Sequence, residues 1–336
     1  MNDVSGGAYY PVGIIQDFLE VAFRKIGMPM ADADFLASVI VASELAGHEC
    51  HGMRRVPEYI EKVQRGSANP AGRFEVTKDL GAVVLGEGHR AFGHIVLRDV
   101  TDIAIARAKS FGVAAVAARG SESAGRLADY CARAADAGVA TIIFANDSGG
   151  FQHVAPPGAR EARMSTNPIA FGVPRSSGSH LVLDMATSSV AYGRLSETID
   201  RGEPIPKDWV NSSGLLKHFG GVKGFGLAVV VEAMAGALSG GGTVNPEPSS
   251  EDQATLMIAL DVAHFRPLEE FVGEVERFTT YVKDVALDDG AAPVRMPGES
   301  ASLNAAKVME AGILVRPVIA RRLSEALKPY GLDLPK

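Results

Sequence analysis

The feature that most constrains the fold is a change in hydrophobic spacing near Gly81. Before this point, apolar residues recur every three or four positions, the spacing that lets a helix bury one face. After it, short apolar runs rich in β-branched residues alternate with helical segments, as expected when strands alternate with helices. The chain is therefore predicted to be an α/β protein with a helical opening and a central sheet.

The predicted elements also indicate how the chain divides. Helices are predicted over residues 12–26, 32–52, 57–63, 94–110, 125–137, 225–238 and 269–285, and from 301 almost to the end. Strands are predicted over residues 82–85, 113–118, 140–145, 169–173, 181–184 and 256–260, with a further short one over 294–296. Because the helical ends can pack together, we expect a discontinuous helical domain, 1–78 with 301–336, and a mixed α/β domain over 79–300.

Composition limits the classes of function. A formal net charge of -7 speaks against nucleic acid or an anionic membrane surface as the main partner. No run approaches the roughly 18 apolar residues that a membrane span needs, and residues 1–10 lack the layout of a signal peptide. Cys50 and Cys131 are too few for a disulfide framework, which favours a reduced, cytoplasmic protein.

The segment from Gly47 to Arg55, GHECHGMRR, carries the clearest chemistry. If the helix continues through it, His51 and Arg55 lie four residues apart and share a face. Arg55 could then hold a carboxylate through two parallel hydrogen bonds. His51, with an ordinary pKa of about 6.5, could exchange a proton with a neighbouring carbonyl or imine. The plainer interpretation is a solvated helix end, where basic residues are favoured by the helix dipole.

Two other chemistries suit the same segment less well. His48, Cys50 and His51 are soft ligands, but no CxxC or HExxH pattern accompanies them, so no metal site is expected. A nucleophile pair of Cys50 and His51 is conceivable. Neighbouring helical residues diverge by about 100°, however, which makes direct activation of the thiol awkward.

Several turns rich in glycine, proline and asparagine could bind a ligand. The turn 85–93 resembles a dinucleotide fingerprint, but its third glycine falls two positions late and no acidic residue follows, so we reject a Rossmann domain. Lys223 stands among glycines at a helix start, a setting that binds phosphate, although the Walker A spacing is absent. The turns 166–168, 184–188 and 296–300 complete the set, and each alone is no more specific than an ordinary loop.

Taken together, these segments form a recognisable order. It comprises the block 44–70, HVAP at 153–156, TNP at 166–168, DMATS at 184–188, RGEP at 201–204, KGFGL at 223–227 and PGE at 297–299. In this order the chain, from about Val12 to its C-terminal helix, resembles the malate/L-lactate dehydrogenase-like family of NAD(P)-dependent oxidoreductases. That family includes ureidoglycolate and sulfolactate dehydrogenases, diketogulonate reductase and piperideine-2-carboxylate reductase.

The resemblance implies a fold, a reaction and a set of site residues. The fold is a non-Rossmann NAD(P)-binding mixed-sheet domain with a helical substrate domain, assembled as a homodimer. The reaction interconverts a small 2-oxo acid, or a cyclic imino acid, and its 2-hydroxy or amino acid, with NAD or NADP as cofactor. His51 is then the proton donor, Arg55 binds the substrate carboxylate, and Thr166 contacts the substrate. The residues that would contact the cofactor are Ser121, Ser123, Gly125, Asp184, Met185, Ala186, Thr187, Val222, Lys223, Pro297, Gly298 and Glu299.

Several departures from the family pattern bear on the reaction. Cys50 stands where the family has a serine that orients the histidine, and a thiol is a weaker hydrogen-bond partner. Ser123 replaces a histidine near the nicotinamide, and Glu122 places a negative charge where a phosphate-bearing cofactor would approach. Arg194 replaces the aspartate of the ketimine reductases, which speaks against that subgroup, and the loop 209–220 looks shortened.

These departures leave three hypotheses open. The first is an NAD(P)H-dependent oxidoreductase. The second is a family member with non-redox chemistry, a lyase, isomerase or cyclase that uses His51 and Cys50 as catalytic residues. The third is a silent partner or ligand-binding homologue, which the retention of His51 and Arg55 disfavours.

Overall fold

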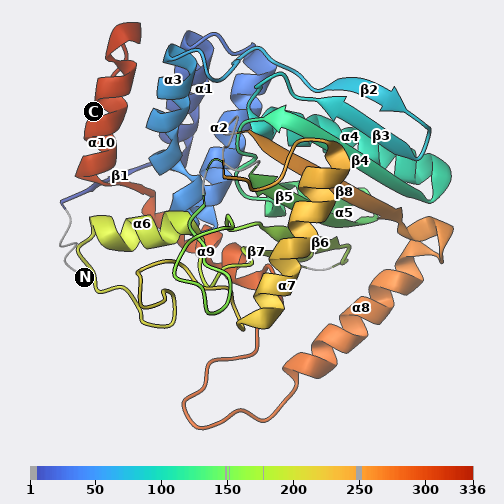
Figure 1. The fold of residues 1–336 in the computed structure, drawn as a ribbon. Helices are drawn as coiled ribbons and strands as arrows, with labels where there is room; N and C mark the ends of the chain where they lie inside the picture. Colours follow the sequence, from blue (N-terminus) through green and yellow to red (C-terminus); the bar gives the residue numbers. More distant parts are fainter. Residues whose placement is uncertain (1–5, 148–149, 151, 177, 247–251, 336) are drawn as a thin grey trace.

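The computed structural model describes residues 6–147, 150, 152–176, 178–246 and 252–335 (Figure 1). Its helices are α1 (Val12–Lys25), α2 (Met30–Leu45), α3 (Val56–Gln64), α4 (Gly93–Phe111), α5 (Ala128–Asp136), α6 (Tyr192–Asp200), α7 (Val222–Val231), α8 (Leu268–Lys283), α9 (Glu299–Ala311) and α10 (Pro317–Leu327). Its strands are β1 (Ala8–Tyr10), β2 (Glu75–Asp79), β3 (Val83–Glu87), β4 (Val113–Ser121), β5 (Val139–Asp147), β6 (Ile169–Val173), β7 (Leu181–Met185), β8 (Gln253–Asp261) and β9 (Ile313–Val315).

A seven-stranded mixed sheet forms the centre, in the order β2-β3-β4-β8-β5-β6-β7. β3 and β4 run parallel, and the other neighbouring pairs are antiparallel. β8 comes from late in the chain and lies between β4 and β5, so the sheet is complete only when distant segments meet. The α/β prediction is therefore confirmed, and the sheet differs from the parallel sheet of a Rossmann domain.

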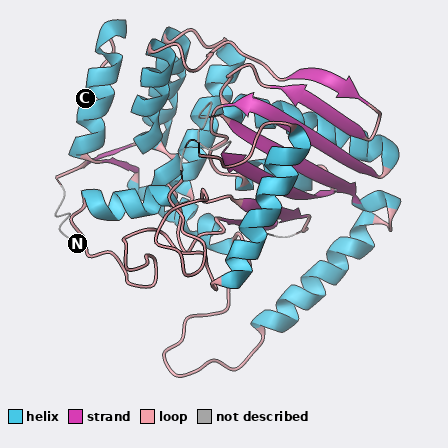
Figure 2. Cartoon of the chain, viewed as in Figure 1, coloured by secondary structure: helices cyan, strands magenta, loops and turns pink. Residues whose placement is uncertain are grey.

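Helices cover both faces of this sheet (Figure 2). Side chains alternate along each strand, so in β8 Met257 packs with α4 and α5, whereas Leu256 faces the opposite way. On that second face Leu256 meets Val231 of α7 and Ala235 of the π-helix Glu232–Ala237 that extends it. The sheet is thus buried between two helical layers.

A further apolar core joins the two ends of the chain. Helices α1, α2 and α3 pack with α10 through buried side chains, among them Ile15, Leu36, Ile60 and Leu323, and gather at one end of the molecule (Figure 1). β1 pairs antiparallel with β9, residue 8 opposite residue 315. Each of these strands has only three residues, too few to form from local sequence preference. Each therefore forms by pairing with the other.

Two helix predictions are wrong in extent. The helix expected over residues 32–52 ends at Leu45, because Gly47 takes a φ of 79°, which terminates a helix. The predicted C-terminal helical run is broken at Gly312, with a φ of 89°, and by β9; α10 then begins at Pro317. Residues 294–296 are irregular rather than a strand, and α6 was not predicted.

Candidate active site

His51 and Arg55 lie in two successive 3-10 turns, Glu49–His51 and Met53–Arg55. We call residues 48–55 the His51 turn. Gly52, between the two, has a φ of -95° and a ψ of -143°. A Cβ on Gly52 would lie 2.1 Å from Oε1 of Glu44, so no other residue type fits there without movement. His51 and Arg55 therefore approach through two turns rather than on one helical face, which corrects the geometry expected from the sequence.

Positive charge surrounds the imidazole of His51. Burial lowers the pKa of His51 to about 3, and the charges of Arg55 and Arg126, with His48 and His94, act in the same direction. The ring is therefore neutral in the free protein at neutral pH. A ligand carboxylate bound near Arg55 would oppose this positive charge and raise the pKa of His51. Protonation of His51 thus depends on what is bound beside it.

Arg55 is held in place by its own helical neighbours. Its Nη1 lies 2.8 Å from the carboxylate of Glu58, and its guanidinium lies over the ring of Tyr59, 5.8 Å from the centroid. The side chain stays about one-third exposed, at 32%. A guanidinium has five N–H donors in a rigid fork, so the pair with Glu58 leaves donors for a ligand carboxylate.

His94 joins this group, although the sequence did not point to it. It is the second residue of α4 and is 2% exposed. Its ring meets Tyr59 edge-on at 5.5 Å, and its Nδ1 has no hydrogen-bond partner within the described residues. Burial, with the charge of Arg55, lowers the pKa of His94 to about 3. In the sequence, His94 is marked only by its place directly after Gly93, where the helix starts. Such a position does not by itself indicate a site residue.

Arg126 is the second residue that the sequence did not reveal. It follows Gly125 and forms an ion pair with Asp129 of α5. Its charge acts on His51 and also on Asp184 of β7. The charge of Arg126 therefore reaches both the predicted proton donor and one of the predicted cofactor residues, which are far apart in the sequence.

Cys50 is packed rather than presented to solvent. A Cβ on Gly193 of α6 would lie 2.6 Å from the Cβ of Cys50, so α6 lies directly against the turn. Burial, with the negative charge of Glu197, raises the pKa of the Cys50 thiol to about 11. The thiol is thus protonated at neutral pH and poorly suited to act as a nucleophile.

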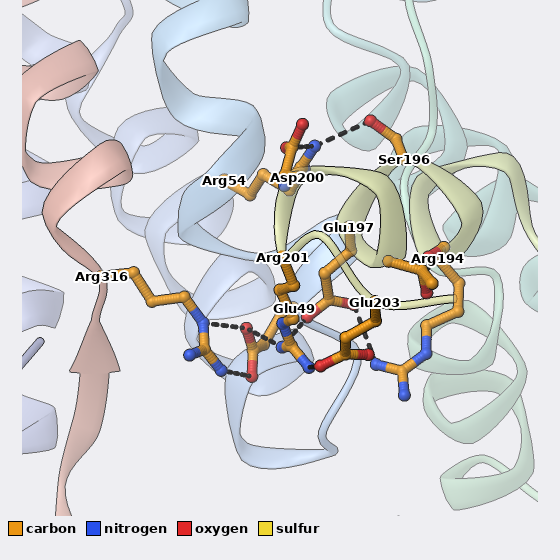
Figure 3. A network of polar contacts seen from close by, with 10 residues as sticks. Glu49, Arg54, Arg194, Ser196, Glu197, Asp200, Arg201, Glu203 and Arg316 are labelled. Carbon is orange, nitrogen blue, oxygen red and sulfur yellow. Dashed lines mark hydrogen bonds and ion pairs between the residues drawn. The ribbon is translucent and has the colours of Figure 1, made fainter. Parts of the chain in front are cut away.

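Ion pairs fasten α6 to the His51 turn (Figure 3). Arg54 donates to Asp200 at 2.5 Å and to the hydroxyl of Ser196 at 2.8 Å. On the other side of the turn, Glu49 accepts hydrogen bonds from Arg201 at 3.4 Å and from Arg316 at 3.3 Å. The turn is therefore tied both to α6 and to the segment that leads into α10.

Glu197 is the buried centre of the α6 part of this network. It is 5% exposed, pairs with Arg194 at 2.9 Å, and also pairs with Arg201. Arg194, which replaces an aspartate of the ketimine reductases, is thus engaged with a carboxylate of its own helix (Figure 3).

The predicted substrate and cofactor residues around β7 form a second group. The amide and hydroxyl of Thr187 donate to the carbonyl of Thr166 at 2.9 and 3.0 Å, which joins these two turns. Asp184 accepts a hydrogen bond from the amide of Ala128 at 2.9 Å, and burial raises its pKa to about 6. Met185 ends β7, and Ala186 links it to Thr187.

A cavity of about 640 Å³ adjoins the start of α7. Its lining includes Arg160, Ser189, Lys217, Gly220 and Gly221. Both glycines have positive φ, 55° and 62°, and a Cβ on Gly221 would meet nothing within 4 Å, so the turn is open. Val222 and Lys223 follow directly in the first turn of α7.

The turn Pro297–Glu299 lies beside β7 as well. The carbonyl of Pro297 accepts a hydrogen bond from the amide of Val182 at 3.3 Å. Gly298 has a φ of 96° and passes close to the backbone of residue 180. Glu299 accepts hydrogen bonds from Lys283 at 2.8 Å and from the amide of Met296 at 3.0 Å, so its carboxylate is engaged within the protein.

The turn after β4 holds the remaining predicted residues and a buried ion pair. Ser121 ends β4 and is buried; Ser123 accepts a weak hydrogen bond from the amide of Gly125 at 3.4 Å. The carboxylate of Glu122 is 2.5 Å from Lys62 of α3, and both side chains are buried. The negative charge expected from Glu122 is therefore paired with Lys62 inside the protein rather than presented to a cofactor.

Within the described parts of the chain, no three His, Cys, Asp or Glu side chains group so as to hold a metal ion. None of the described helices combines the length and apolar character needed to cross a membrane.

The sequence model of the family described as malate/L-lactate dehydrogenase matches residues 12–324. The chain belongs to this family. An L-lactate dehydrogenase of Cupriavidus necator is 32% identical over 328 residues, which cover 92% of this chain and 94% of the relative. An L-sulfolactate dehydrogenase of Methanothermobacter thermautotrophicus is 29% identical, with 96% of each chain covered.

Solved structures of family members share the whole fold. The malate dehydrogenase of Pyrococcus horikoshii is 26% identical and covers 100% of this chain and 99% of its own, with a TM-score of 0.87. The sulfolactate dehydrogenase of Methanocaldococcus jannaschii is 28% identical and covers 97% and 98%, with a TM-score of 0.86. The piperideine-2-carboxylate reductase of Pseudomonas syringae is 26% identical and covers 95% and 99%, with a TM-score of 0.80.

Malate/L-lactate dehydrogenase family members use NAD or NADP, and the residues of this chain fit such a dinucleotide. The cofactor carries anionic phosphates, and the cavity beside α7 presents two cations, Arg160 and Lys217, against one carboxylate, Asp208, with an open turn at Gly220 and Gly221. Cations beside a glycine-rich backbone are the donor set that phosphate prefers. Lys223 follows this turn directly and adds a further cation.

Proposed function

We propose that this protein is an NAD(P)H-dependent oxidoreductase that interconverts a small 2-oxo acid, or a cyclic imino acid, and its 2-hydroxy or amino acid. The observation that carries this proposal is the His51 turn. There the imidazole of His51 is neutral, and the charge of the partly exposed guanidinium of Arg55 acts on it. Arg55 anchors the substrate carboxylate, and His51 moves a proton at the adjacent carbon–oxygen or carbon–nitrogen bond. Family relatives named as lactate and sulfolactate dehydrogenases favour the hydroxy acids.

Each residue then has a separate task. Arg55 binds the carboxylate of the substrate through its fork of N–H donors, and Thr166 contacts the substrate. His51 donates a proton to the oxygen or nitrogen during reduction and removes it during oxidation. The bound nicotinamide supplies or accepts the hydride. Because the carboxylate raises the pKa of His51, the ring gains its proton when the substrate is in place.

The non-redox alternative receives no support. It needs Cys50 or His51 to act without a nicotinamide, yet burial keeps the Cys50 thiol protonated. The reported relatives are named as dehydrogenases or a reductase. Cys50 is better placed to help position the His51 turn, because its Cβ packs against Gly193 of α6.

The proposal is tested by turnover and by the His51→Gln variant. Small 2-oxo acids and cyclic imino acids are offered with NADH and with NADPH, and oxidation of the nucleotide is followed. We expect His51→Gln to lower kcat by about 10²- to 10⁴-fold, the usual contribution of a general acid, with nucleotide affinity unchanged. His89→Gln is the control and should keep its activity, because His89 is exposed, pairs with Glu75 and lies outside the His51 turn. Wild-type turnover in His51→Gln would contradict the assignment.

We also propose that the chain acts as a homodimer in the cytoplasm. Support for the dimer comes from α8 and the segment after it, which project from the body of the molecule (Figure 1). They expose the apolar side chains of Phe278, Tyr281, Val282, Val285 and Leu287. A solution mass of one chain by light scattering would contradict the dimer. The two unpaired cysteines support a reducing compartment.

The apolar cores support the proposed division into domains. One core joins the first helices to α10, and another lies around the central sheet, in line with domains of 1–78 with 301–336 and of 79–300.

A further inference from the structure

Glu44 is a buried carboxyl group directly behind the His51 turn. It lies in the last turn of α2 and is 7% exposed. Within the described residues it forms no ion pair. Its hydrogen bond is with the backbone amide of Met53, which donates to Oε1 at 2.6 Å. A buried carboxyl group is costly unless it has a task or a partner, and its one partner belongs to the active-site turn.

The side chain of Glu44 also fills the space beside Gly52. A Cβ built on Gly52 would lie 2.1 Å from Oε1, 2.6 Å from Cδ and 2.9 Å from Cγ of Glu44. The Gly52–Met53 peptide connects the 3-10 turn that carries His51 to the one that carries Arg55. Glu44 therefore contacts the hinge between the predicted acid and the predicted carboxylate anchor.

We propose that Glu44 is a positioning residue for the proposed reaction, whose buried carboxyl group fixes the Gly52–Met53 peptide so that His51 and Arg55 meet the same substrate. This inference rests on the proposed function. It assigns no contact between Glu44 and the substrate, since Glu44 acts through the backbone of the turn.

The charges around Glu44 add a dependence on pH. Glu49 of the turn, Glu197 of α6 and Arg316 before α10 face it, and Figure 3 shows these three in one network. Burial, followed by the two carboxylates, raises the pKa of Glu44 to about 8, against the opposing effects of the Met53 amide and Arg316. Glu44 is thus neutral at pH 7. Ionisation above this pKa strengthens the bond to the Met53 amide but adds a third negative charge beside Glu49 and Glu197. We expect this repulsion to loosen the turn from α6.

Two variants test the positioning role through activity. Glu44→Gln keeps the length and the acceptor but never ionises, so we expect activity at pH 7 within about twofold of wild type and loss of the alkaline decline near pH 8. Glu44→Asp is one methylene shorter, which draws the carboxyl group away from the Met53 amide, so kcat should fall on the order of 10- to 100-fold, with nucleotide affinity little changed. Wild-type kcat in Glu44→Asp, or an unchanged alkaline decline in Glu44→Gln, would overturn the proposal.

A measurement that does not need turnover separates this inference from the proposed function. The backbone amide resonance of Met53 should shift with pH in the wild-type protein, with a midpoint near pH 8, and should not do so in Glu44→Gln. Glu49→Gln removes a neighbouring carboxylate and should move that midpoint to lower pH. If no substrate is turned over but Met53 titrates, the proposed function fails while the Glu44 contact stands. If Met53 does not titrate in an active enzyme, the inference about Glu44 fails.

Discussion

His51 and Arg55 act as a coupled pair at the residue scale, because the charge of Arg55 adds to the effect of burial in keeping His51 neutral. Arg55 keeps its guanidinium over Tyr59 and beside Glu58, and contributes to holding the pKa of His51 at about 3 after burial. Binding of a carboxylate to Arg55 offsets this charge. Substrate binding and activation of the acid are therefore one event.

Replacing Arg55 by lysine tests the role of the fork. Lysine keeps the positive charge but loses the two parallel hydrogen bonds, so kcat/KM for a 2-oxo acid should fall about 10- to 100-fold, mostly through KM. Arg133→Lys is the matched control, since Arg133 pairs with the exposed Asp102 outside the His51 turn. Steady-state kinetics decide the matter, and an unchanged KM in Arg55→Lys would remove Arg55 from substrate binding.

The sequence identifies a site residue when its type and its near neighbours carry the signal. His51 and Arg55 meet this condition, because the pair stands four residues apart in one short segment. His94 and Arg126 do not, because the folding of separate turns brings them to His51. The pairing of Glu122 could not be predicted for the same reason. Its partner Lys62 lies 60 residues earlier in the chain.

At the scale of elements, local periodicity predicts the larger pieces and misses those that depend on pairing. The central strands and the helices that cover them were predicted within a few residues, since each carries its own apolar pattern. β1 and β9 have three residues each and form only against one another. The position of β8 between β4 and β5 is also beyond local sequence, because it depends on the register of strands over 100 residues apart.

The packing of α6 on the His51 turn gives a prediction at this scale. A methyl group at position 193 would meet the Cβ of Cys50 at 2.6 Å, so Gly193→Ala should push α6 from the turn and lower kcat/KM by about tenfold. Gly226→Ala in α7 is the matched control, because its Cβ would meet nothing within 4 Å, and it should be neutral or stabilise by up to about 1 kcal/mol. Equal kinetics in the two variants would show that α6 does not position the turn.

At the scale of the whole molecule, neutral histidines of the candidate active site make stability depend on pH. His51 and His94 stay neutral in the folded protein down to about pH 3, whereas in the unfolded chain they gain protons below about pH 6.5. The unfolded state binds more protons between these values, so the free energy of unfolding falls as pH falls. Each histidine contributes up to about 1.4 kcal/mol per pH unit.

His94→Gln tests this account of acid sensitivity. The variant removes one of the histidines with a lowered pKa, so the free energy of unfolding should decline less steeply between pH 6 and 4 than in the wild type, as urea unfolding at several pH values measures. His89→Gln, an exposed histidine paired with Glu75, is the control. The same slope in His94→Gln and the wild type would mean that His94 is not buried as a neutral ring.

We propose that the two parts of the molecule together bind a nicotinamide dinucleotide beside the His51 turn. The most direct test is calorimetric titration of the purified protein with NADH and with NADPH. We predict binding of at least one of them with a micromolar Kd, about -8 kcal/mol, and weaker binding in Lys223→Ala. Failure of both nucleotides to bind the wild-type protein would contradict the account and leave His51 with redox-neutral chemistry.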